Sequence, residues 1–490
     1  MENDSPDARL VLRLREAVGR GDATLDLSYE RMGDAGVLLL TRVFDLSHVR
    51  LLNLGWNGIT DIGVRALAGC ASLAGLTHLQ LASNSIGNGG AQAIAQAAHW
   101  SRLQLLNLTH NRVGDEGALQ LIKSKKLAGL EYLELELNRL GLAHVTRYPD
   151  GPANPKLRWL NLRRNKIRSD RLAEWVQAGA FIPLEHLNLG WNYLEDPGVQ
   201  ALSASPFTRL DHLLLDHNWI GDAGARALAN SKHLGSLRFL NMADNQFNGE
   251  GERVLMDLRI RQLIKTRLQG GQLNLNGQKL GNTGLKALAR AEALKDVESL
   301  SLRNNFFDHE GVVALADSPH LGNLKSLNLM DNAIGDKGMV ALCGAEALAG
   351  LRALNIEACG VTLTGLKALA VSPLNGLEQL NVSGNDLGCD GAEVLACGKN
   401  FSGLKTLQIW NSGLGDRGFT ALAQSENLTA LEELRLSGNS IGVLGYQAYD
   451  QATGLAALKT LDLRQNRFSP NSYLLFTESP RFTRLCELRF

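Results

Sequence analysis

The chain has 490 residues, and its 50 basic and 50 acidic side chains give a formal net charge of zero. This balance gives no electrostatic support for a nucleic-acid ligand or an anionic membrane surface. The six cysteines lack the paired spacing of a metal cluster or a disulfide framework, so we expect reduced thiols, no metal and no cofactor.

The start of the chain gives no sign of export or membrane insertion. Residues 1–22 lack the basic and apolar segments of a secretory signal, and no stretch approaches the roughly 18 apolar residues of a membrane helix. The sequence therefore predicts a cytoplasmic protein.

Residues 1–23 are predicted to form an N-terminal helical cap. Ser5 precedes Pro6, a combination that favours a helix start, and DARLVLRLREAVGR then alternates apolar and charged residues. The repeats that follow need such a segment to cover the open end of their core.

One unit recurs over residues 24–490, and LLNLGWNGITDIGVRALAG at residues 51–69 is typical of it. Its central position is usually Asn and recurs every 26 or 27 residues, with one interval of 33. A fixed period of this size is the signature of a solenoid. The 17 central residues are Glu30, Asn57, Asn84, Asn111, Asn138, Asn165, Asn192, Asn218, Asn245, Gln278, Asn305, Asn332, Cys359, Asn385, Ser412, Asn439 and Asn466.

The first half of each unit predicts a short parallel strand with one buried face. In LTHLQLASN, the residues Leu76, Leu79 and Leu81 point inward and the residues between them point outward. Asn84 closes the strand, and its side chain is predicted to bond to backbone groups in a ladder that repeats from unit to unit.

The second half of each unit predicts a turn followed by a helix. Asp222 is placed as the N-cap of its own helix, and a glycine follows two residues later, as Gly224 does here. Because this glycine recurs in 14 of the 17 units, it indicates close backbone packing between neighbouring turns. The acids equivalent to Asp222 are Asp34, Asp61, Asp115, Asp196, Asp336 and Asp416.

Strands on the inside and wider helices on the outside bend such a stack into a horseshoe. The predicted fold is therefore α/β, a solenoid with a parallel sheet on the concave face and helices on the convex face. Three units depart from the pattern. Residues 139–156 read as an irregular repeat with a proline-rich loop, the next repeat has Arg171 in place of the recurring glycine, and residues 246–272 read as an enlarged repeat with a longer helix.

This pattern resembles the leucine-rich repeats of the ribonuclease-inhibitor-like subfamily, over residues 24–490. The resemblance implies a horseshoe of about 17 repeats, although units of 27 residues are slightly shorter than is usual there. It says little about function, because the same repeat serves inhibitors, GTPase activators, innate immune receptors and ubiquitin-ligase adaptors.

One exposed column of the predicted sheet changes character along the chain. The residue before the central strand leucine is large, aromatic or imidazole in the first half and small or polar in the second. A purely structural role would affect all repeats equally, so the difference favours a protein-binding patch over rings that merely pack on one another. The predicted patch comprises Tyr132, Trp159, His186, His212 and Phe239, extended by Trp191 and His217 at the loop ends of the strands.

A second column is rich in asparagine, and its amides are expected to hydrogen-bond along the row as a structural or adaptable polar floor. Enzymatic interpretations have less support, since the glycines recur singly and form no phosphate loop. The histidines at 186, 212 and 217 lie on adjacent strands of a flat sheet, which rarely encloses a tetrahedral metal ion.

The sequence therefore predicts a monomeric, non-enzymatic scaffold that binds another protein on the concave face. The alternative is a regulator of an enzyme in trans, similar to the Ran-type GTPase-activating proteins, and that likeness assigns no residue here. A GTP-hydrolysis assay with a small GTPase separates the two.

Overall fold

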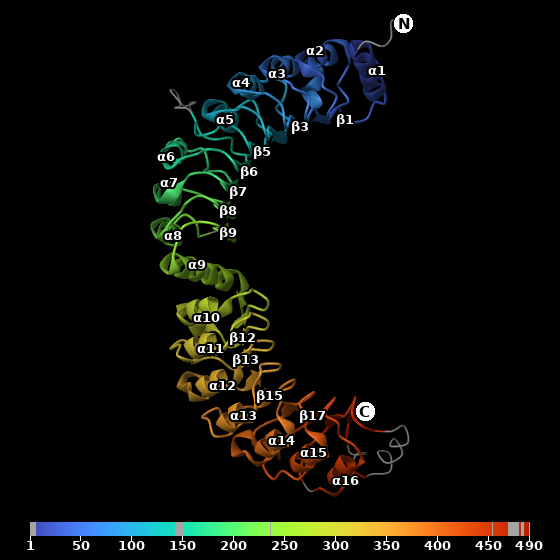
Figure 1. Ribbon diagram of the computed structural model, residues 1–490, viewed down its shortest axis with the longest axis vertical. Helices are drawn as coiled ribbons and strands as arrows, with labels where there is room; N and C mark the ends of the chain where they lie inside the picture. The colour runs from blue at the N-terminus through green and yellow to red at the C-terminus, as the bar shows by residue number, and fades with distance from the viewer. Residues whose placement is uncertain are drawn as a thin grey trace. The chain divides into compact units, whose positions relative to one another are not determined.

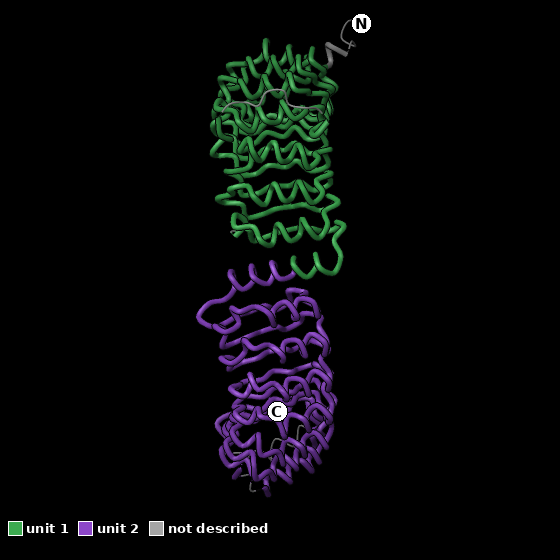
Figure 2. The backbone as a smooth tube through the Cα atoms, turned by 90° about the vertical axis from the view of Figure 1, so that its left-hand side faces the viewer, with its two compact units in different colours: residues 1–255 green, residues 256–490 purple. Residues whose placement is uncertain are grey.

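The computed structural model describes residues 6–142, 151–235, 237–452, 454–468, 480–481 and 485–489, with side chains from residue 10. The chain divides into two compact units, residues 1–255 and residues 256–490, and the boundary falls within helix α9 (Figure 2). In each unit a layer of parallel strands is covered on one side by a layer of helices (Figure 1).

Unit 1 holds a nine-stranded sheet in which every strand pairs in parallel with the next one along the chain. Its strands are β1 (Thr24–Asp26), β2 (Leu51–Asn53), β3 (His78–Gln80), β4 (Leu105–Asn107), β5 (Tyr132–Glu134), β6 (Trp159–Asn161), β7 (His186–Asn188), β8 (His212–Leu214) and β9 (Phe239–Asn241). Its helices are α1 (Pro6–Gly19), α2 (Gly33–Val43), α3 (Asp61–Ala68), η1 (Ala71–Gly75), α4 (Asn88–Ala95), α5 (Asp115–Ile122), α6 (Ser169–Gln177), α7 (Glu195–Ser203), α8 (Asp222–Ala229) and the first part of α9 (Gly249–Arg267).

Unit 2 holds a ten-stranded sheet that begins with an antiparallel pair and continues in parallel. Its strands are β10 (Leu268–Gln269), β11 (Gln272–Asn274), β12 (Ser299–Ser301), β13 (Ser326–Asn328), β14 (Ala353–Asn355), β15 (Gln379–Asn381), β16 (Thr406–Gln408), β17 (Glu433–Arg435), β18 (Thr460–Asp462) and β19 (Glu487–Arg489). Its helices are the rest of α9, α10 (Gly281–Ala289), η2 (Glu292–Asp296), α11 (His309–Ala316), α12 (Gly335–Gly344), η3 (Glu346–Leu348), α13 (Leu363–Ala370), α14 (Gly388–Cys397), η4 (Lys399–Phe401), α15 (Gly415–Ala423) and α16 (Val443–Gln451).

The core of each unit lies between its sheet and its helices. The predicted inward residues Leu76, Leu79 and Leu81 are fully buried, and the helices bury a stripe that contains Ala225 and Leu228 in α8. Burying one leucine stabilises the fold by about 2 kcal/mol, and the same contacts recur in every repeat. None of the helices in the described ranges is both long and apolar enough to span a membrane.

The predicted asparagine ladder is present and connects neighbouring repeats. Asn111 donates from Nδ2 to the carbonyls of Leu81 at 2.9 Å and Leu108 at 3.1 Å, while its Oδ1 accepts from the Ile86 backbone nitrogen at 3.0 Å. The buried amide thus satisfies backbone groups that the turn leaves unpaired. At the Cys359 position the thiol donates to the Leu329 carbonyl at 3.2 Å, which preserves one of these bonds.

The role predicted for the recurring aspartate is wrong in one respect. Asp222 is the first residue of α8 and makes no cap bond to its own helix, whose N-cap is Gly221. Its carboxylate instead accepts from the backbone nitrogens of Asn248 at 2.9 Å and Gly251 at 3.0 Å, in the next repeat. Asp34, Asp61, Asp196, Asp336 and Asp416 likewise accept at the start of the helix of the following repeat. Asp115 accepts from the Gly141 nitrogen at 2.8 Å, in the irregular repeat.

This inter-repeat cap explains the recurring glycine. A Cβ atom at Gly224 would lie 2.8 Å from Oδ1 of Asp196, the carboxylate that accepts from the Gly224 nitrogen at 2.8 Å. A Cβ at Gly365 would lie 2.7 Å from Oδ1 of Asp336 in the same way. Glycine is required because a side chain would displace the carboxylate of the preceding repeat.

The two irregular segments differ in how much of them is described. For the predicted irregular repeat, residues 143–150 lie outside the described residues, and the described residues 135–142 and 151–158 contain no helix. The enlarged repeat contains α9 and then a β-hairpin that the sequence did not predict. Gly270 and Gly271 form its turn with φ values of +53° and +74°, which two-residue turns of this kind need at both positions.

Candidate binding surface on the sheet of unit 1

The exposed column of unit 1 carries a continuous row of rings, which we call the ring row: Tyr132, Trp159, His186, His212 and Phe239. The parallel register places these five residues opposite one another on β5 to β9. Ring centroids are separated by 4.7 Å for Trp159 and His186, 4.3 Å for His186 and His212, and 5.6 Å for His212 and Phe239. The structure therefore brings the predicted residues together.

The two ends of the ring row are its most exposed members. Tyr132 is 42% exposed and Phe239 is 48% exposed, whereas the three rings between them are half-buried against their neighbours. Tyr132 differs from the others because its ring contacts no other ring among the described residues. Apolar ring surface of this extent is available for contact with a ligand.

The other two predicted residues form a second stack beyond the carboxyl ends of β7 and β8. The rings of Trp191 and His217 are stacked with centroids 4.0 Å apart, and the guanidinium of Arg164 lies 5.4 Å from the Trp191 centroid. Trp191 and His217 have positive φ values of 57° and 55°, the left-handed conformation that ends each strand before the ladder asparagine.

This left-handed position carries further rings that the sequence reasoning missed. Tyr29 and Trp56 stack with centroids 5.6 Å apart, and Trp56 meets His110 edge-on at 6.1 Å. Trp56 is 51% exposed and Tyr29 is 68% exposed. The signal that would have found them is their sequence position, directly before the central residue of the repeat.

Charged groups between the two rows are held in a fixed arrangement. Arg163 donates to both carboxylate oxygens of Asp216, at 3.1 Å and 2.9 Å, across the intervening repeat. The equivalent residue of that repeat is Gly190, where a Cβ would lie 2.6 Å from Asp216 Oδ1. The absence of a side chain at Gly190 therefore allows an ion pair to cross a whole strand, and it leaves Asp216 only 5% exposed.

The remaining carboxylates of this region lie on and after β5. Glu134 accepts from the Asn161 amide at 2.7 Å, and Glu136 accepts from the same amide at 3.4 Å. Burial raises the pKa of Glu134 above its usual value, and the Asn161 hydrogen bond only partly offsets that effect. Glu134 is thus a carboxylate whose charge the protein solvates poorly.

The imidazoles of the ring row are packed closely enough to influence one another. Burial lowers the pKa of His186 below its usual value, and the nearby His212 lowers it further. The His186 ring is therefore predominantly neutral at pH 7 and stacks as a flat, weakly polar group. Within the described ranges, no group of three or more His, Cys, Asp or Glu side chains is arranged to hold a metal ion.

The asparagine column does not hydrogen-bond along itself as expected. The side-chain oxygens of Asn161, Asn188 and Asn355 each accept from the backbone nitrogen two residues further on, at 2.9 to 3.0 Å. These local turns fix the amide orientation, and Asn53, Asn107 and Asn328 form the same bond. The amide hydrogens then remain available to neighbouring carboxylates, as in the bond from Asn161 to Glu134.

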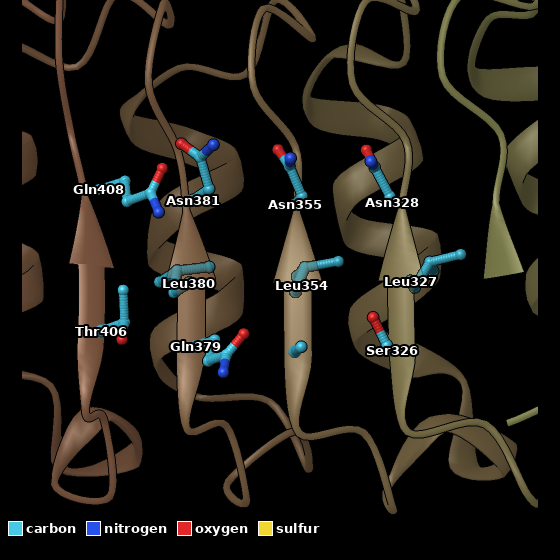
Figure 3. A pocket seen from close by; sticks show the side chains of 11 residues that line it. Ser326, Leu327, Asn328, Leu354, Asn355, Gln379, Leu380, Asn381, Thr406 and Gln408 are labelled. Carbon is cyan, nitrogen blue, oxygen red and sulfur yellow. The ribbon is translucent and has the colours of Figure 1, made fainter. Parts of the chain in front are cut away.

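The same face of unit 2 is hollowed and carries no rings at the equivalent positions of β13 to β16. A hollow of about 250 Å³ crosses these four strands and is lined by polar side chains, Ala353 and the three leucines Leu327, Leu354 and Leu380, with no charged residue (Figure 3). Ser326, Ala353, Gln379 and Thr406 occupy the positions that hold rings in unit 1. The two units therefore share a fold and differ in the chemistry of this face.

Comparisons with known proteins agree with this repeat architecture. The family model described as Leucine Rich repeat matches residues 45–68, 76–95, 103–121, 182–203, 210–229, 320–343 and 377–396. A search of the curated proteins finds no significant match.

Solved structures with significant similarity include an internalin from Listeria monocytogenes, at 18% identity and a TM-score of 0.28, covering 99% of this chain and 95% of that chain. Another is the leucine-rich-repeat ectodomain of the plant receptor kinase GASSHO1/SCHENGEN3 from Arabidopsis thaliana in complex with CASPARIAN STRIP INTEGRITY FACTOR 2. It is 16% identical with a TM-score of 0.28, and the match covers 90% of this chain but 58% of that one.

These TM-scores are low, so the assignment depends on the sequence match and on the repeat geometry. Strand, ladder asparagine and helix recur with the period of the matched segments in both units. The chain is a solenoid of leucine-rich repeats.

Proposed function

We propose that this protein is a non-enzymatic interaction scaffold that binds a protein partner on the concave sheet face, mainly through unit 1. Leucine-rich-repeat proteins generally mediate protein–protein interactions. The ring row, together with Trp191 and His217, would supply the contact surface. Trp and Tyr provide large contact areas and are enriched at binding hot spots.

The observation that carries the proposal is the contrast between the two units. Both sheets use the same buried leucines and the same ladder, so the core places no demand on the exposed column. Rings nevertheless occupy five consecutive strands of unit 1, whereas the equivalent strands of unit 2 carry Ser326, Ala353, Gln379 and Thr406. A second row of rings, which includes Trp56 and Trp191, follows the same division.

The packing of these rings supports recognition of a folded or extended partner at low entropic cost. From Trp159 to Phe239 each ring contacts the next one along the row, and the Arg163–Asp216 ion pair fixes the surface between the rows. A surface whose side chains are already ordered loses little conformational freedom when it binds.

Two finer assignments accompany this proposal. A helix of about two turns or more accompanies most repeats, which favours the ribonuclease-inhibitor-like subfamily. All six cysteines are free in the described residues, which favours a reducing, cytoplasmic location. We propose a monomer, because one copy of the chain carries the whole surface.

The experiment is affinity capture from native cell extract with wild type and a Trp159→Ala, His212→Ala, Phe239→Ala triple variant. The matched control carries three substitutions on the same face of unit 2, Gln379→Ala and Thr406→Ala together with Ser326→Ala. Circular dichroism and thermal melting verify folding of both variants. A partner retained by wild type and control but lost by the ring variant supports the proposal, whereas equal capture by all three contradicts it.

A further inference from the structure

The charges on the face of unit 1 are unevenly compensated. Three carboxylates on and beside the ring row pair with an arginine: Glu136 with Arg164 at 3.9 Å, Asp216 with Arg163 at 2.9 Å and Asp211 with Arg238 at 2.8 Å. A fourth, Asp244, lies 3.4 Å from a ring nitrogen of His217. The fifth is Glu134, which has no ion pair among the described residues. Glu134 on β5 is therefore a carboxylate without a cationic partner among the described residues.

Glu134 lies beside the exposed end of the ring row. It shares its strand and its face with Tyr132, two residues earlier, and it lies opposite Asn161 just as Tyr132 lies opposite Trp159. Trp159 stacks on His186 of the next strand and makes no ring contact with Tyr132 among the described residues. A carboxylate without a cation is thus placed next to two aromatic rings that do not cover each other.

This combination has a specific complement. Aromatic faces attract a guanidinium or ammonium group through the ring quadrupole, and a partly buried carboxylate without a counter-ion strengthens that attraction. Deprotonated Glu134 already accepts one hydrogen bond from Asn161, which orients its carboxylate and leaves further lone pairs for an incoming donor.

We propose that the partner presents an arginine or lysine side chain, which binds between Tyr132 and Trp159 and pairs with Glu134. This inference rests on the proposed function and names the chemistry of the segment that occupies the ring row. The rest of that segment would extend across the stacked rings of His186 and His212 towards Phe239, where apolar side chains fit.

Unit 2 offers a matched carboxylate without the rings. Glu357 accepts from the Asn381 amide at 2.8 Å and has no ion pair among the described residues. The strand positions near it hold Ala353 and Gln379 instead of aromatic residues. Glu357→Gln therefore removes the same charge and preserves the same hydrogen-bonding shape, but it leaves the proposed site intact.

The test uses the full chain and a displayed library of random twelve-residue peptides as the probe. Peptides enriched by the wild type are synthesised, and their affinities are measured by fluorescence anisotropy for wild type, Glu134→Gln, Glu357→Gln and Trp159→Ala. We expect the enriched peptides to share an Arg or Lys, with affinity reduced about tenfold by Glu134→Gln, since hydrogen bonds to charged groups have about this effect. Glu357→Gln should change the affinity less than about twofold, because Glu357 is not part of the proposed site and separate sites act independently.

A charge reversal gives the sharpest result. Selection against Glu134→Lys should enrich Asp or Glu at the peptide position where the wild type enriched Arg or Lys. Peptides that need Trp159 but show no basic residue, or are indifferent to Glu134→Gln, would overturn this inference and leave the proposed function standing. Peptides that bind Trp159→Ala as well as the wild type, or a failure to enrich any peptide, would overturn both.

Discussion

The inter-repeat cap predicts an effect at a distance that a cap within one helix would not produce. The carboxylate of Asp336, in the first turn of α12, accepts from Thr362 N at 2.8 Å, Thr362 Oγ1 at 2.7 Å and Gly365 N at 3.0 Å, all at the start of α13. Asp336→Ala removes these three bonds. Loss of a helix cap costs about 1–2 kcal/mol, and this loss should fall on α13 and not on α12.

Hydrogen exchange followed by mass spectrometry measures this effect segment by segment. A cost of about 1–2 kcal/mol corresponds to exchange about 5- to 30-fold faster for amides in the first turn of α13. Lys337→Ala, an exposed neighbour on α12, is the control and should leave both helices unchanged. Faster exchange at the start of α12 with α13 unaffected would refute the reasoning, because it would place the cap of Asp336 within its own helix.

The same carboxylate should respond to acid in a defined direction. Burial acts to raise the pKa of Asp336, but hydrogen bonds from Thr362 and Gly365 outweigh burial and leave the pKa below its usual value. An aspartate with a lowered pKa contributes stability above the pKa of the unfolded chain and loses it as the pH falls through the folded value. Protection of the first turn of α13 should therefore decline as the pH falls below about 4, and Asp336→Ala should show no such decline.

Three further predictions concern other parts of the chain. Gly190→Ala should displace the Arg163–Asp216 ion pair and so separate the buried Asp216 carboxylate from its arginine. Chemical denaturation should then show a destabilisation of about 3 kcal/mol. The control is Gly344→Ala, because a Cβ atom at Gly344 meets nothing within 4 Å. Cys343 and Cys359 should not react with a thiol reagent at pH 8 until the protein unfolds, since burial raises their pKa values to about 11 and about 12. Because the pKa of His186 is lowered in the folded protein, this residue binds a proton more readily in the unfolded chain. Below pH 6.5, the melting temperature of the wild type should therefore fall more steeply with decreasing pH than that of His186→Gln.

The regular part of the fold was predictable because its physical causes repeat with the sequence. A leucine at every second strand position and an asparagine after it determine which face is buried, so Leu79 and Asn111 occupy their expected places. The ring row followed from the same register, since residues at one position of the repeat must lie on neighbouring strands.

Errors arose where a bond could run either within a repeat or to the next one. Asp222 has the spacing of an N-cap in its own helix, yet its partners lie 26 and 29 residues later. In a solenoid, residues one period apart in the sequence are as close in space as residues of one turn. The spacing of an aspartate in the sequence therefore does not show whether it caps its own helix or the next one. The asparagine column shows the reverse error, since Asn188 bonds within its own repeat to Gly190 and not along the row.

The features that the sequence did not reveal depend on backbone conformation. Tyr29, Trp56 and His110 are adjacent in space because the residue before the ladder position takes a left-handed conformation in each repeat. Nothing in their residue types indicates that conformation, because side chains with a Cβ adopt it infrequently. The hairpin at Gly270 and Gly271 is similar, since two glycines in succession are consistent with several kinds of turn.

Different residues of each repeat form the core and the exposed face of the sheet, which explains how the two units share a fold but differ in the chemistry of that face. Leucines, the ladder asparagine, the cap aspartate and its glycine make the contacts between repeats, and each of them lies in the core or in the turns. The exposed column on the sheet makes none of these core and turn contacts, so the core and the turns do not determine which residues it carries. The contacts that stack the repeats therefore require neither the rings in unit 1 nor the polar groups in unit 2. Rings nonetheless occupy this column on five consecutive strands of unit 1, and the proposed binding of a partner on this face would account for them.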